Sequence, residues 1–408
     1  MRGLGQIQKT DSTYELLPAG RPCRERIIED IRAASSYVLL INFLARKDAS
    51  TDGIAEALLD NGNAQSLWIK DRIAAFYEYS EQDGQSFFHD NPRQDHMWWT
   101  PHRLQTVYWQ ARFMDRFYRN GAEKNVKKNP LREQLVDAPN ITVIDDNKLY
   151  DHSKLIVVDG KLCYIGDMGF GDDFLGDNPK YLSYMLRIED KDHTKDLLRT
   201  VTGLKKPGEP SGFINGREVH RQALEFIHKT RERIIVESSY LGNRAYIKAL
   251  REILFRRVKV LLLLPEEANV HQHRNRHFVK TLRRMSGAPD NLEVHTTPLS
   301  HSKMMVRDNK EAWIGSHNLS MINGTVNDTV FLSSDIKVVD QVKAALLHHK
   351  RLGKKDLCSE NWKEILAPSL LEQASVKWQF VARSSRLLSV GYARKKCRRK
   401  ILELVGPL

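Results

Sequence analysis

The sequence predicts an α/β fold built from two similar α/β/α sandwich domains that are related by a pseudo-twofold axis. Helix-like and strand-like periodicities alternate along the chain, which indicates sheets with helices on their faces. The same order of elements occurs twice, about 150 residues apart, which is too long for a solenoid repeat. Each copy also ends in a cluster of short strands. Each copy is therefore expected to be one domain, with the active site at the interface between them.

The two copies contain the same elements in the same order. The first copy predicts a helix over 24–35, a strand over 37–43, a helix over 53–60, a strand over 64–69, and short strands over 141–144, 154–158, 162–165 and 185–188. The second copy predicts a helix over 218–229, a strand over 233–237, a helix over 243–254, a strand over 258–264, and short strands over 292–295, 303–306, 312–314 and 329–332. Asp159-Gly160 and Asp308-Asn309 are typical turn sequences between two of these strands.

This repeat divides the chain into four predicted parts. The parts are a first domain over 1–202, a Gly- and Pro-rich linker over 203–214, a second domain over 215–352 and a basic C-terminal extension over 353–408. An aromatic-rich insertion over 70–137 has no counterpart in the second copy. The insertion is expected either to pack its own aromatic core or to form a wall over the site that meets lipid or the organic part of a substrate.

The composition is that of an ordinary globular protein with a basic balance. The formal net charge is +13 and the isoelectric point is about 9.4, which favours anionic partners such as nucleic acid or an anionic lipid surface. No uncharged apolar run reaches the roughly 18 residues of a membrane-spanning helix. Four scattered cysteines and an N-terminus without an apolar signal region favour a cytoplasmic protein, with peripheral attachment to a membrane left open.

One motif is repeated with identical internal spacing. The pattern His-x-Lys-x4-Asp-x6-Gly occurs as His152, Lys154, Asp159 and Gly166, and again as His301, Lys303, Asp308 and Gly315. A single His-x-Lys pair would carry no information. Two long patterns at equivalent places in a repeated domain are hard to obtain by chance, so the motif residues are the candidate catalytic set.

The residue types in this motif fit phosphoryl transfer. Alternate side chains of a strand share a face, so each histidine points the same way as its lysine. If the halves pack about a pseudo-twofold axis, two imidazoles and two ammonium groups meet in one cleft. One histidine can then attack phosphorus while the other protonates the leaving oxygen. The lysines supply the positive charge, so no metal or other cofactor is expected. Asp159 and Asp308 are expected to be structural partners of the motif.

The duplicated motif resembles the signature of the phospholipase D superfamily, and residues 155–175 are similar in style to its cardiolipin synthase-like branch. The resemblance covers most of residues 15–350. It implies a ping-pong mechanism through a phosphohistidine on His152, with His301 as the acid, and no metal cofactor. It also implies that Ser316 and Asn318, beside Gly166 and Gly315, help to hold the phosphate.

The sequence departs from this pattern at four positions. Asp167 stands where the family usually has Gly or Ser, and Gly169 stands where it usually has Asn. The family also places a carboxylate downstream of each motif to orient a histidine. A rough match puts Ser183 and Thr329 at those two places, with Asp328 next to Thr329. These departures are consistent with reduced activity, or with the use of Asp328 or another acid as the orienting carboxylate.

Three functions remain open, in this order. The first is hydrolysis or transfer of the phosphatidyl group of phospholipids, which the motif style, the aromatic insertion and the basic tail over 383–400 favour. The second is a nuclease of the same superfamily, which the net charge also fits. The third is a phosphate- or lipid-binding relative without catalytic activity.

Overall fold

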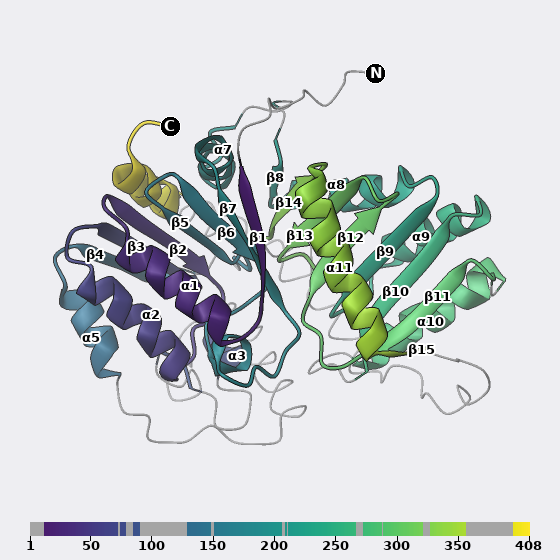
Figure 1. Cartoon of the computed structure of the whole chain (residues 1–408), viewed down its shortest axis with the longest axis horizontal. Helices are drawn as coiled ribbons and strands as arrows, with labels where there is room; N and C mark the ends of the chain where they lie inside the picture. Colours follow the sequence, from purple (N-terminus) through teal and green to yellow (C-terminus); the bar gives the residue numbers. More distant parts are fainter. Residues whose placement is uncertain are drawn as a thin grey trace, which may run out of the picture.

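The computed structural model describes residues 12–71, 74–78, 85–89, 129–147, 151–205, 209, 211–266, 272–287, 289–320, 327–355 and 395–408. These residues form two mixed β-sheets that lie beside one another, each with helices against it (Figure 1). The predicted fold class, two similar α/β units, is confirmed.

The first sheet has seven strands in the order β1-β7-β6-β5-β2-β3-β4. Its strands are β1 (Thr13–Pro18), β2 (Tyr37–Asn42), β3 (Gln65–Asp71), β4 (Ile141–Asn147), β5 (Leu155–Val158), β6 (Leu162–Gly166) and β7 (Tyr184–Glu189). β2, β3 and β4 run parallel, while β5, β6, β7 and β1 pair antiparallel.

The second sheet repeats this topology and adds one strand. Its order is β15-β11-β10-β9-β12-β13-β14-β8, with β9, β10 and β11 parallel and the other pairs antiparallel. The strands are β8 (Phe213–Asn215), β9 (Arg233–Ser238), β10 (Lys259–Pro265), β11 (Leu292–Thr297), β12 (Lys303–Arg307), β13 (Glu311–Gly315), β14 (Thr329–Ser333) and β15 (Lys354–Lys355). Strands β2, β5, β6 and β7 thus correspond to β9, β12, β13 and β14.

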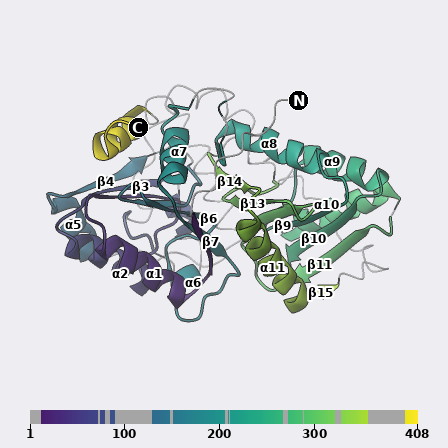
Figure 2. The same ribbon diagram turned by 45° about the horizontal axis from the view of Figure 1, so that its top comes forward.

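Helices cover both faces of each sheet (Figure 2). The helices of the first half are α1 (Arg21–Arg32), α2 (Ala49–Asp60), α3 (Ala75–Glu78), α5 (Pro130–Asp137), α6 (Asp172–Leu175) and α7 (Lys191–Val201). Those of the second half are α8 (Arg217–His228), α9 (Arg244–Phe255), α10 (Gln272–Ser286) and α11 (Ile336–Leu352). Within the described residues, no helix combines the length and the apolar character needed to cross a bilayer.

The apolar periodicity of the helices decides which side they bury. In α1 the buried side chains are Cys23, Ile27 and Ile31, each four residues apart and therefore on one face. They belong to a core between the first sheet and its outer helices, and a matching core lies between the second sheet and α8, α9 and α10. A third core joins the two halves, where α11 and the inner faces of both sheets contribute. This shared core fixes the two motifs relative to one another.

The connections of the structure fall close to the predicted boundaries. The predicted linker 203–214 follows α7, and β8 begins at Phe213. The division into domains stays a prediction. Most of the aromatic insertion lies outside the described residues, including Trp98, Trp99 and Trp109. Phe87 and Phe88 are described, and both rings pack against Trp68 of β3. These two aromatic residues therefore belong to the core of the first half.

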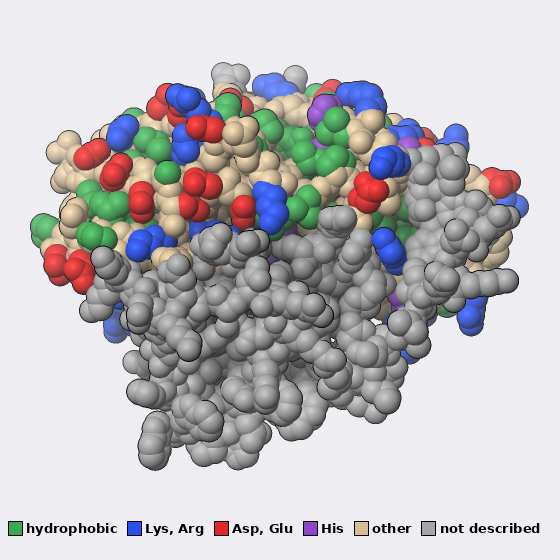
Figure 3. Space-filling view, turned by 90° about the horizontal axis from the view of Figure 1, so that it is seen from below, with side chains coloured by type: hydrophobic (Ala, Val, Ile, Leu, Met, Phe, Trp, Pro, Cys, Tyr) green, Lys and Arg blue, Asp and Glu red, His purple; other side chains and the backbone are tan. Residues whose placement is uncertain are grey.

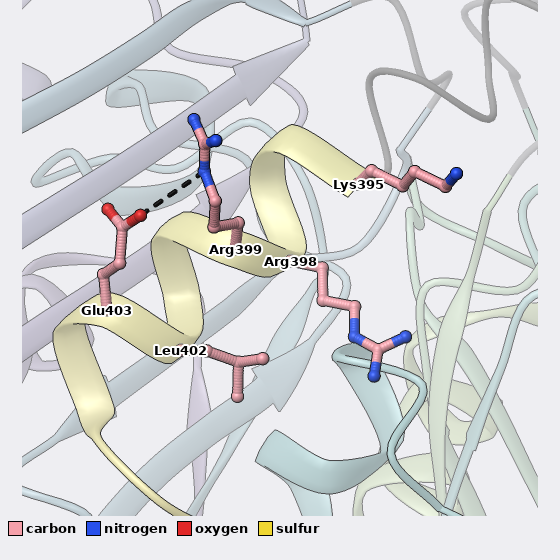
Figure 4. Close-up of a pocket in the computed structure, with 5 residues that line it drawn as sticks. All are labelled: Lys395, Arg398, Arg399, Leu402 and Glu403. Carbon is pink, nitrogen blue, oxygen red and sulfur yellow. Dashed lines mark ion pairs between the residues drawn. The ribbon is translucent and has the colours of Figure 1, made fainter.

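A C-terminal helix over 395–405 packs against the inter-half core (Figures 1 and 4). Cys397 and Ile401 are buried in that core, while Arg399 pairs with Glu403 on the other side at 3.3 Å. The rest of the predicted basic segment, 383–394, lies outside the described residues. Because its apolar side covers the protein's own core, this helix has only its basic side left for a membrane surface.

Candidate active site

The two motifs meet where the halves exchange short backbone contacts. Asp151 forms a parallel bridge with Asn327, and Leu182 forms one with Ser300. The His152 N–H donates to the Asn327 carbonyl, and the His301 N–H donates to the Leu182 carbonyl, each at 2.8 Å. Each motif histidine is therefore held by the opposite half, which places the two histidines in one polar cluster with Lys154 and Lys303.

His152 is oriented by acceptors from the second half. Its Nδ1 lies 3.0 Å from the Asp328 carboxylate and 3.0 Å from the Ser316 carbonyl. Both groups only accept, so Nδ1 carries the proton and the neutral ring has its lone pair on Nε2. Burial and the Lys154 charge together lower the pKa of His152 to about 4, against the opposing effect of Asp328. The ring also packs edge-on against Phe43. His152 is thus a neutral imidazole with its lone pair on Nε2.

His301 has different surroundings. Its ring packs edge-on against Phe174, and Lys303 Nζ lies 3.1 and 3.2 Å from its two ring nitrogens. Burial holds the pKa of His301 well below its ordinary value, and the charges of Lys303 and Lys154 lower it further. A hydrogen bond to the Asp167 backbone opposes these effects. Within the described residues, no carboxylate hydrogen bonds to this ring.

Both lysines are buried and point back at their own motifs. Lys154 Nζ donates to the His152 carbonyl, and Lys303 Nζ donates to the His301 carbonyl at 2.6 Å. Burial lowers the pKa of Lys303 to about 8, although three nearby carboxylates oppose it. Burial and the charge of Lys303 hold the pKa of Lys154 well below its ordinary value. Two buried lysines whose charges repel one another favour an anionic ligand.

Asp328 is the central anion of the second half. Its buried carboxylate accepts from His152, from His317 Nδ1 at 3.1 Å and from Ser316 Oγ at 2.8 Å. Burial raises the pKa of Asp328, but the hydrogen bonds from the two histidines outweigh it and hold the pKa below its ordinary value. His317 is itself held by the Tyr246 hydroxyl at 2.7 Å. Asp328 is therefore an ionised carboxylate that fixes the ring of His152.

Comparison with known proteins agrees with this geometry. A family model described as "Cardiolipin synthase, PLD-like domain" matches residues 223–350, which include the second motif. Residues 223–350 therefore carry a phospholipase D-like domain. Cardiolipin synthase 2 of Staphylococcus epidermidis is 23% identical over 244 residues. That match covers 52% of this chain and 49% of the relative, so the chain spans about half the length of the curated relatives it matches.

Solved structures share the fold across nearly the whole chain. Phosphatidylserine synthase of Haemophilus influenzae Rd KW20 superposes with a TM-score of 0.58 at 11% identity, over 93% of this chain and 94% of that one. Polyphosphate kinase of Porphyromonas gingivalis superposes with a TM-score of 0.50 at 12% identity, over 91% of this chain and 53% of that one. At identities this low, the two matches show a shared fold alone.

The aspartates of the phospholipase D motif lie away from the histidine cluster. Asp159 and Asp308 follow β5 and β12 at the far ends from the histidines, with φ of 52° and 51°. The Asp159 carboxylate accepts backbone N–H groups of residues 35–37, and that of Asp308 accepts those of residues 231–233. Each carboxylate thus fixes the start of a neighbouring strand. These contacts fit the structural role expected for both aspartates, and their place in the candidate catalytic set stays a prediction.

The predicted phosphate-binding residues divide into two groups. Ser316 is buried and already engaged, because its hydroxyl donates to Asp328 and its carbonyl accepts from His152. Asn318 is only 7% exposed, and its Oδ1 has no hydrogen-bond partner in the described part of the chain. Asn318 therefore keeps a polar atom available beside the site, whereas Ser316 supports the site from behind.

Gly166 and Gly315 lie at the strand ends, where the backbones approach closely. A Cβ on Gly166 would lie 2.2 Å from the Tyr184 carbonyl, and one on Gly315 would lie 2.4 Å from that of Thr329. These glycines permit the close approach of neighbouring strands. Gly169 is also tightly packed, since a Cβ there would lie 2.9 Å from Leu44 Cβ. An Asn at this position, as the family usually has, would need Leu44 to move.

We expect Gly166→Ala to destabilise the fold by about 1–3 kcal/mol, because the added methyl group meets backbone that shifts only with the sheet. Gly62→Ala is the matched control, since a Cβ there meets nothing within 4 Å, and it should change stability by less than about 0.5 kcal/mol. Urea unfolding of both variants measures the difference. Equal stability of the two would show that the strands at Gly166 can separate at little cost.

A second buried network, absent from the sequence prediction, supports the His301 segment. Glu237 of β9 accepts from Ser300 Oγ at 2.7 Å and from His349 Nδ1 at 2.9 Å. His349 Nε2 in turn lies 3.0 Å from the Tyr184 hydroxyl of the first half. Two features of the sequence indicate this network. Glu237 is a charged residue in a largely apolar strand, and His349 shares the apolar face of α11.

Proposed function

We propose that this chain is a phosphodiesterase of phospholipase D type that hydrolyses or transfers the phosphatidyl group of phospholipids through a phosphohistidine. The observation that carries the proposal is the arrangement of the two histidines. His152 has Nδ1 held by Asp328 and its lone pair on Nε2, and His301 lies in the same cluster with Lys303 and Lys154. A nucleophile, a second imidazole and two cations are the groups that exchange of a phosphate diester requires.

The first half-reaction forms the covalent intermediate. Nε2 of His152 attacks phosphorus, an N–P bond forms, and the P–O bond to the leaving alcohol breaks. The protonated ring of His301 gives its proton to the departing oxygen. The ring of His301 is neutral in the empty site, so the anionic phosphate must favour its protonation by offsetting the charges of Lys154 and Lys303.

The second half-reaction restores the enzyme. Neutral His301 takes a proton from water or from an acceptor alcohol, and the oxygen of that molecule attacks phosphorus. The N–P bond breaks and His152 is released as a neutral imidazole. Asp328 stabilises the positive charge that the ring of His152 carries as a phosphohistidine. Water as acceptor gives hydrolysis, whereas an alcohol gives phosphatidyl transfer.

Substrate class is tested by offering both kinds of diester. Purified full-length chain is incubated with mixed phospholipid vesicles, with and without glycerol, and separately with single-stranded DNA, all in chelator. The cardiolipin synthase-like match over the second motif favours release or exchange of a lipid headgroup. Cleavage of DNA without action on lipid would instead support a nuclease, which the net charge of +13 also fits.

The distribution of charge bears on attachment to a membrane. Seen from below, acidic and basic side chains are interspersed over the described surface rather than gathered by sign (Figure 3). The helix over 395–405 exposes the basic side chains of Lys395, Arg398 and Arg399. We propose that any contact with a bilayer is peripheral and electrostatic, so vesicle binding should weaken as salt is raised.

Activity is expected to survive removal of metal ions. In the proposed mechanism Lys154 and Lys303 neutralise the phosphoryl oxygens in place of a metal, and both are held by hydrogen bonds to their own motifs. The turnover rate measured with EDTA should equal the rate with added Mg²⁺ or Ca²⁺ to within about twofold. A tenfold difference would correspond to about 1.4 kcal/mol in activation free energy. Loss in EDTA that a divalent ion restores would contradict a mechanism based on the lysines.

The pH profile should show a fall on the alkaline side. The pKa of Lys303 in the empty site is about 8, so its positive charge is present below that pH and is lost above it. Since kcat/KM reports groups of the free enzyme, we expect kcat/KM to decline as pH rises through about 8. A profile that stays flat up to pH 10 would show that the charge of Lys303 is not needed.

A further inference from the structure

The pseudo-twofold axis identifies equivalent residues on either side of the site. The backbone bond from His152 to Asn327 matches the bond from His301 to Leu182, which makes Ser183 the counterpart of Asp328. The Ser316 N–H donates to the Thr329 carbonyl as the Asp167 N–H donates to that of Tyr184, at 3.0 and 3.1 Å. Asp167 is therefore the counterpart of Ser316.

These equivalences reveal an exchange of side chains. In the second half the hydroxyl is at position 316 and the carboxylate at position 328, and Ser316 Oγ donates to Asp328. In the first half the carboxylate is at position 167 and the hydroxyl at position 183, and Ser183 Oγ donates to Asp167. The hydroxyl–carboxylate hydrogen bond is kept while its two members change places. The two departures from the family pattern at these positions therefore compensate one another.

The exchange changes what the carboxylate reaches. Asp328 hydrogen bonds to the ring of His152. Asp167 Oδ2 instead accepts from the backbone N–H of Lys303 at 3.0 Å, and Oδ1 accepts from the Tyr184 N–H at 3.0 Å as well as from Ser183. Asp167 is fully buried, and its contact with Lys303 crosses from one half to the other. The ring of His301 is left with the Asp167 backbone in place of a carboxylate.

We propose that Asp167 and Ser183 are a reversed counterpart of Ser316 and Asp328, and that Asp167 is a positioning residue that directs its negative charge to Lys303 rather than to His301. The site is thus asymmetric: His152 has a carboxylate partner on its ring, whereas in the other half the carboxylate holds the backbone N–H of Lys303. The contact between Asp167 and Lys303 does not depend on any substrate. Only the effect of this contact on turnover rests on the proposed function.

Several charged groups surround Lys303, and the Asp167 carboxylate is the one that also hydrogen bonds to its backbone N–H. Asp167, Asp328 and Glu237 raise the pKa of Lys303 in that order, against burial, which lowers it to about 8. The ring of His301 lies beside Nζ, Lys154 and His152 lie in the same cluster, and His349 is bound to Glu237. Removing the carboxylate at 167 should therefore make Lys303 lose its proton at lower pH than in the wild-type chain.

The test measures the titration of Lys303 itself by NMR of the full-length chain labelled with ¹³C at the lysine ε-carbon, with Lys303→Arg used to assign the signal. Asp167→Ser should lower the midpoint by at least one pH unit, a tenfold change in the ratio of charged to neutral amine. Ser183→Ala is the matched control, because it removes one hydrogen bond but no charge, and its shift should be less than half as large. An unchanged midpoint in Asp167→Ser would overturn the proposal.

The double variant Asp167→Ser with Ser183→Asp tests the exchange directly. It keeps one hydroxyl and one carboxylate, now in the order of the second half, so it remains informative if Asp167→Ser alone does not fold. Its Lys303 midpoint should stay low, while ¹⁵N signals of His301 should show a midpoint at least one unit above the wild-type value. A Lys303 midpoint restored to wild type would overturn the proposal. Absence of turnover on lipid or DNA would count against the proposed function alone, because neither titration depends on substrate.

Discussion

Replacing either His152 or His301 by Ala is expected to reduce turnover by roughly 10³- to 10⁶-fold, because residues that act as one unit fail together. Each histidine takes part in both half-reactions, so neither variant retains a complete cycle. His301 is buried and His152 is partly buried, each beside a lysine, and their loss leaves no other imidazole of the described residues in contact with Lys154 or Lys303. Steady-state release of headgroup from vesicles measures the effect.

His228→Ala is the matched control for this prediction. His228 lies at the end of α8, where it is exposed and pairs with Glu252, toward the end of β12 that is opposite to His301. Its loss should leave turnover unchanged to within about twofold, less than 1 kcal/mol in activation free energy. Near-normal turnover in both His152→Ala and His301→Ala would remove the enzymatic proposal and leave a phosphate- or lipid-binding relative.

The same variants decide which histidine attacks phosphorus. With a diester that carries a good leaving group, His301→Ala should still form a phosphohistidine on His152 slowly, because departure then needs little help from an acid. His152→Ala should form none. Mass spectrometry of each variant after such a substrate locates the adduct. An adduct on His301 in His152→Ala, with none on His152 in His301→Ala, would reverse the assigned roles.

Much of the fold follows from local patterns in the sequence. The alternation of apolar residues placed strands such as β2 and β9 within one or two residues, and the repeated order of elements predicted two equivalent sheets. Short edge strands such as β8 and β15 were not predicted, because two or three residues carry too little periodicity. The C-terminal helix was expected only as a basic tail, since its docking depends on a core that both halves form together.

The candidate site was predictable in its histidines and lysines but not in its carboxylates. The spacing of the motif identified His152, Lys154, His301 and Lys303, because that spacing is repeated. The partner of His152 is Asp328, one residue before the position that the rough match assigned to Thr329. Thr329 instead bonds to Ser153 and Asn215. Which carboxylate reaches His152 is set by contacts between the two halves, and His152 and Asp328 lie 176 residues apart in sequence.

Asp167 shows how a departure from a pattern can mislead when it is considered alone. From sequence, a carboxylate in the first motif would be placed beside His152. The structure directs it across the interface to Lys303, and places Asp328 of the other half beside His152. Which carboxylate serves which histidine follows only from the crossing of the two halves at the pseudo-twofold axis.

Asp328→Asn is expected to lower kcat by about 10³-fold, in the range that loss of an orienting carboxylate causes in histidine-dependent enzymes. The amide has the same shape but no charge, and it can present a donor where the Nδ1 proton of His152 needs an acceptor. His152 then loses the preference for a lone pair on Nε2, and a phosphohistidine loses the anion that stabilises it. Asp328 also holds His317 and Ser316, so part of the effect can come from their displacement.

The control for Asp328→Asn is a second aspartate that changes in the same way. Asp335 caps the N-terminus of α11 through the Lys337 N–H, and Asn caps a helix equally well. Asp335→Asn should keep the kcat and the thermal midpoint of the wild-type chain. Ser316→Ala should keep the charge on Asp328 and lower kcat by less than about twofold, which on a logarithmic scale is a tenth of the loss of about three decades in Asp328→Asn. If Asp328→Asn folds as the wild-type chain does and turns over within tenfold of it, His152 does not depend on this carboxylate, and the assignment of His152 as the carboxylate-supported nucleophile is wrong.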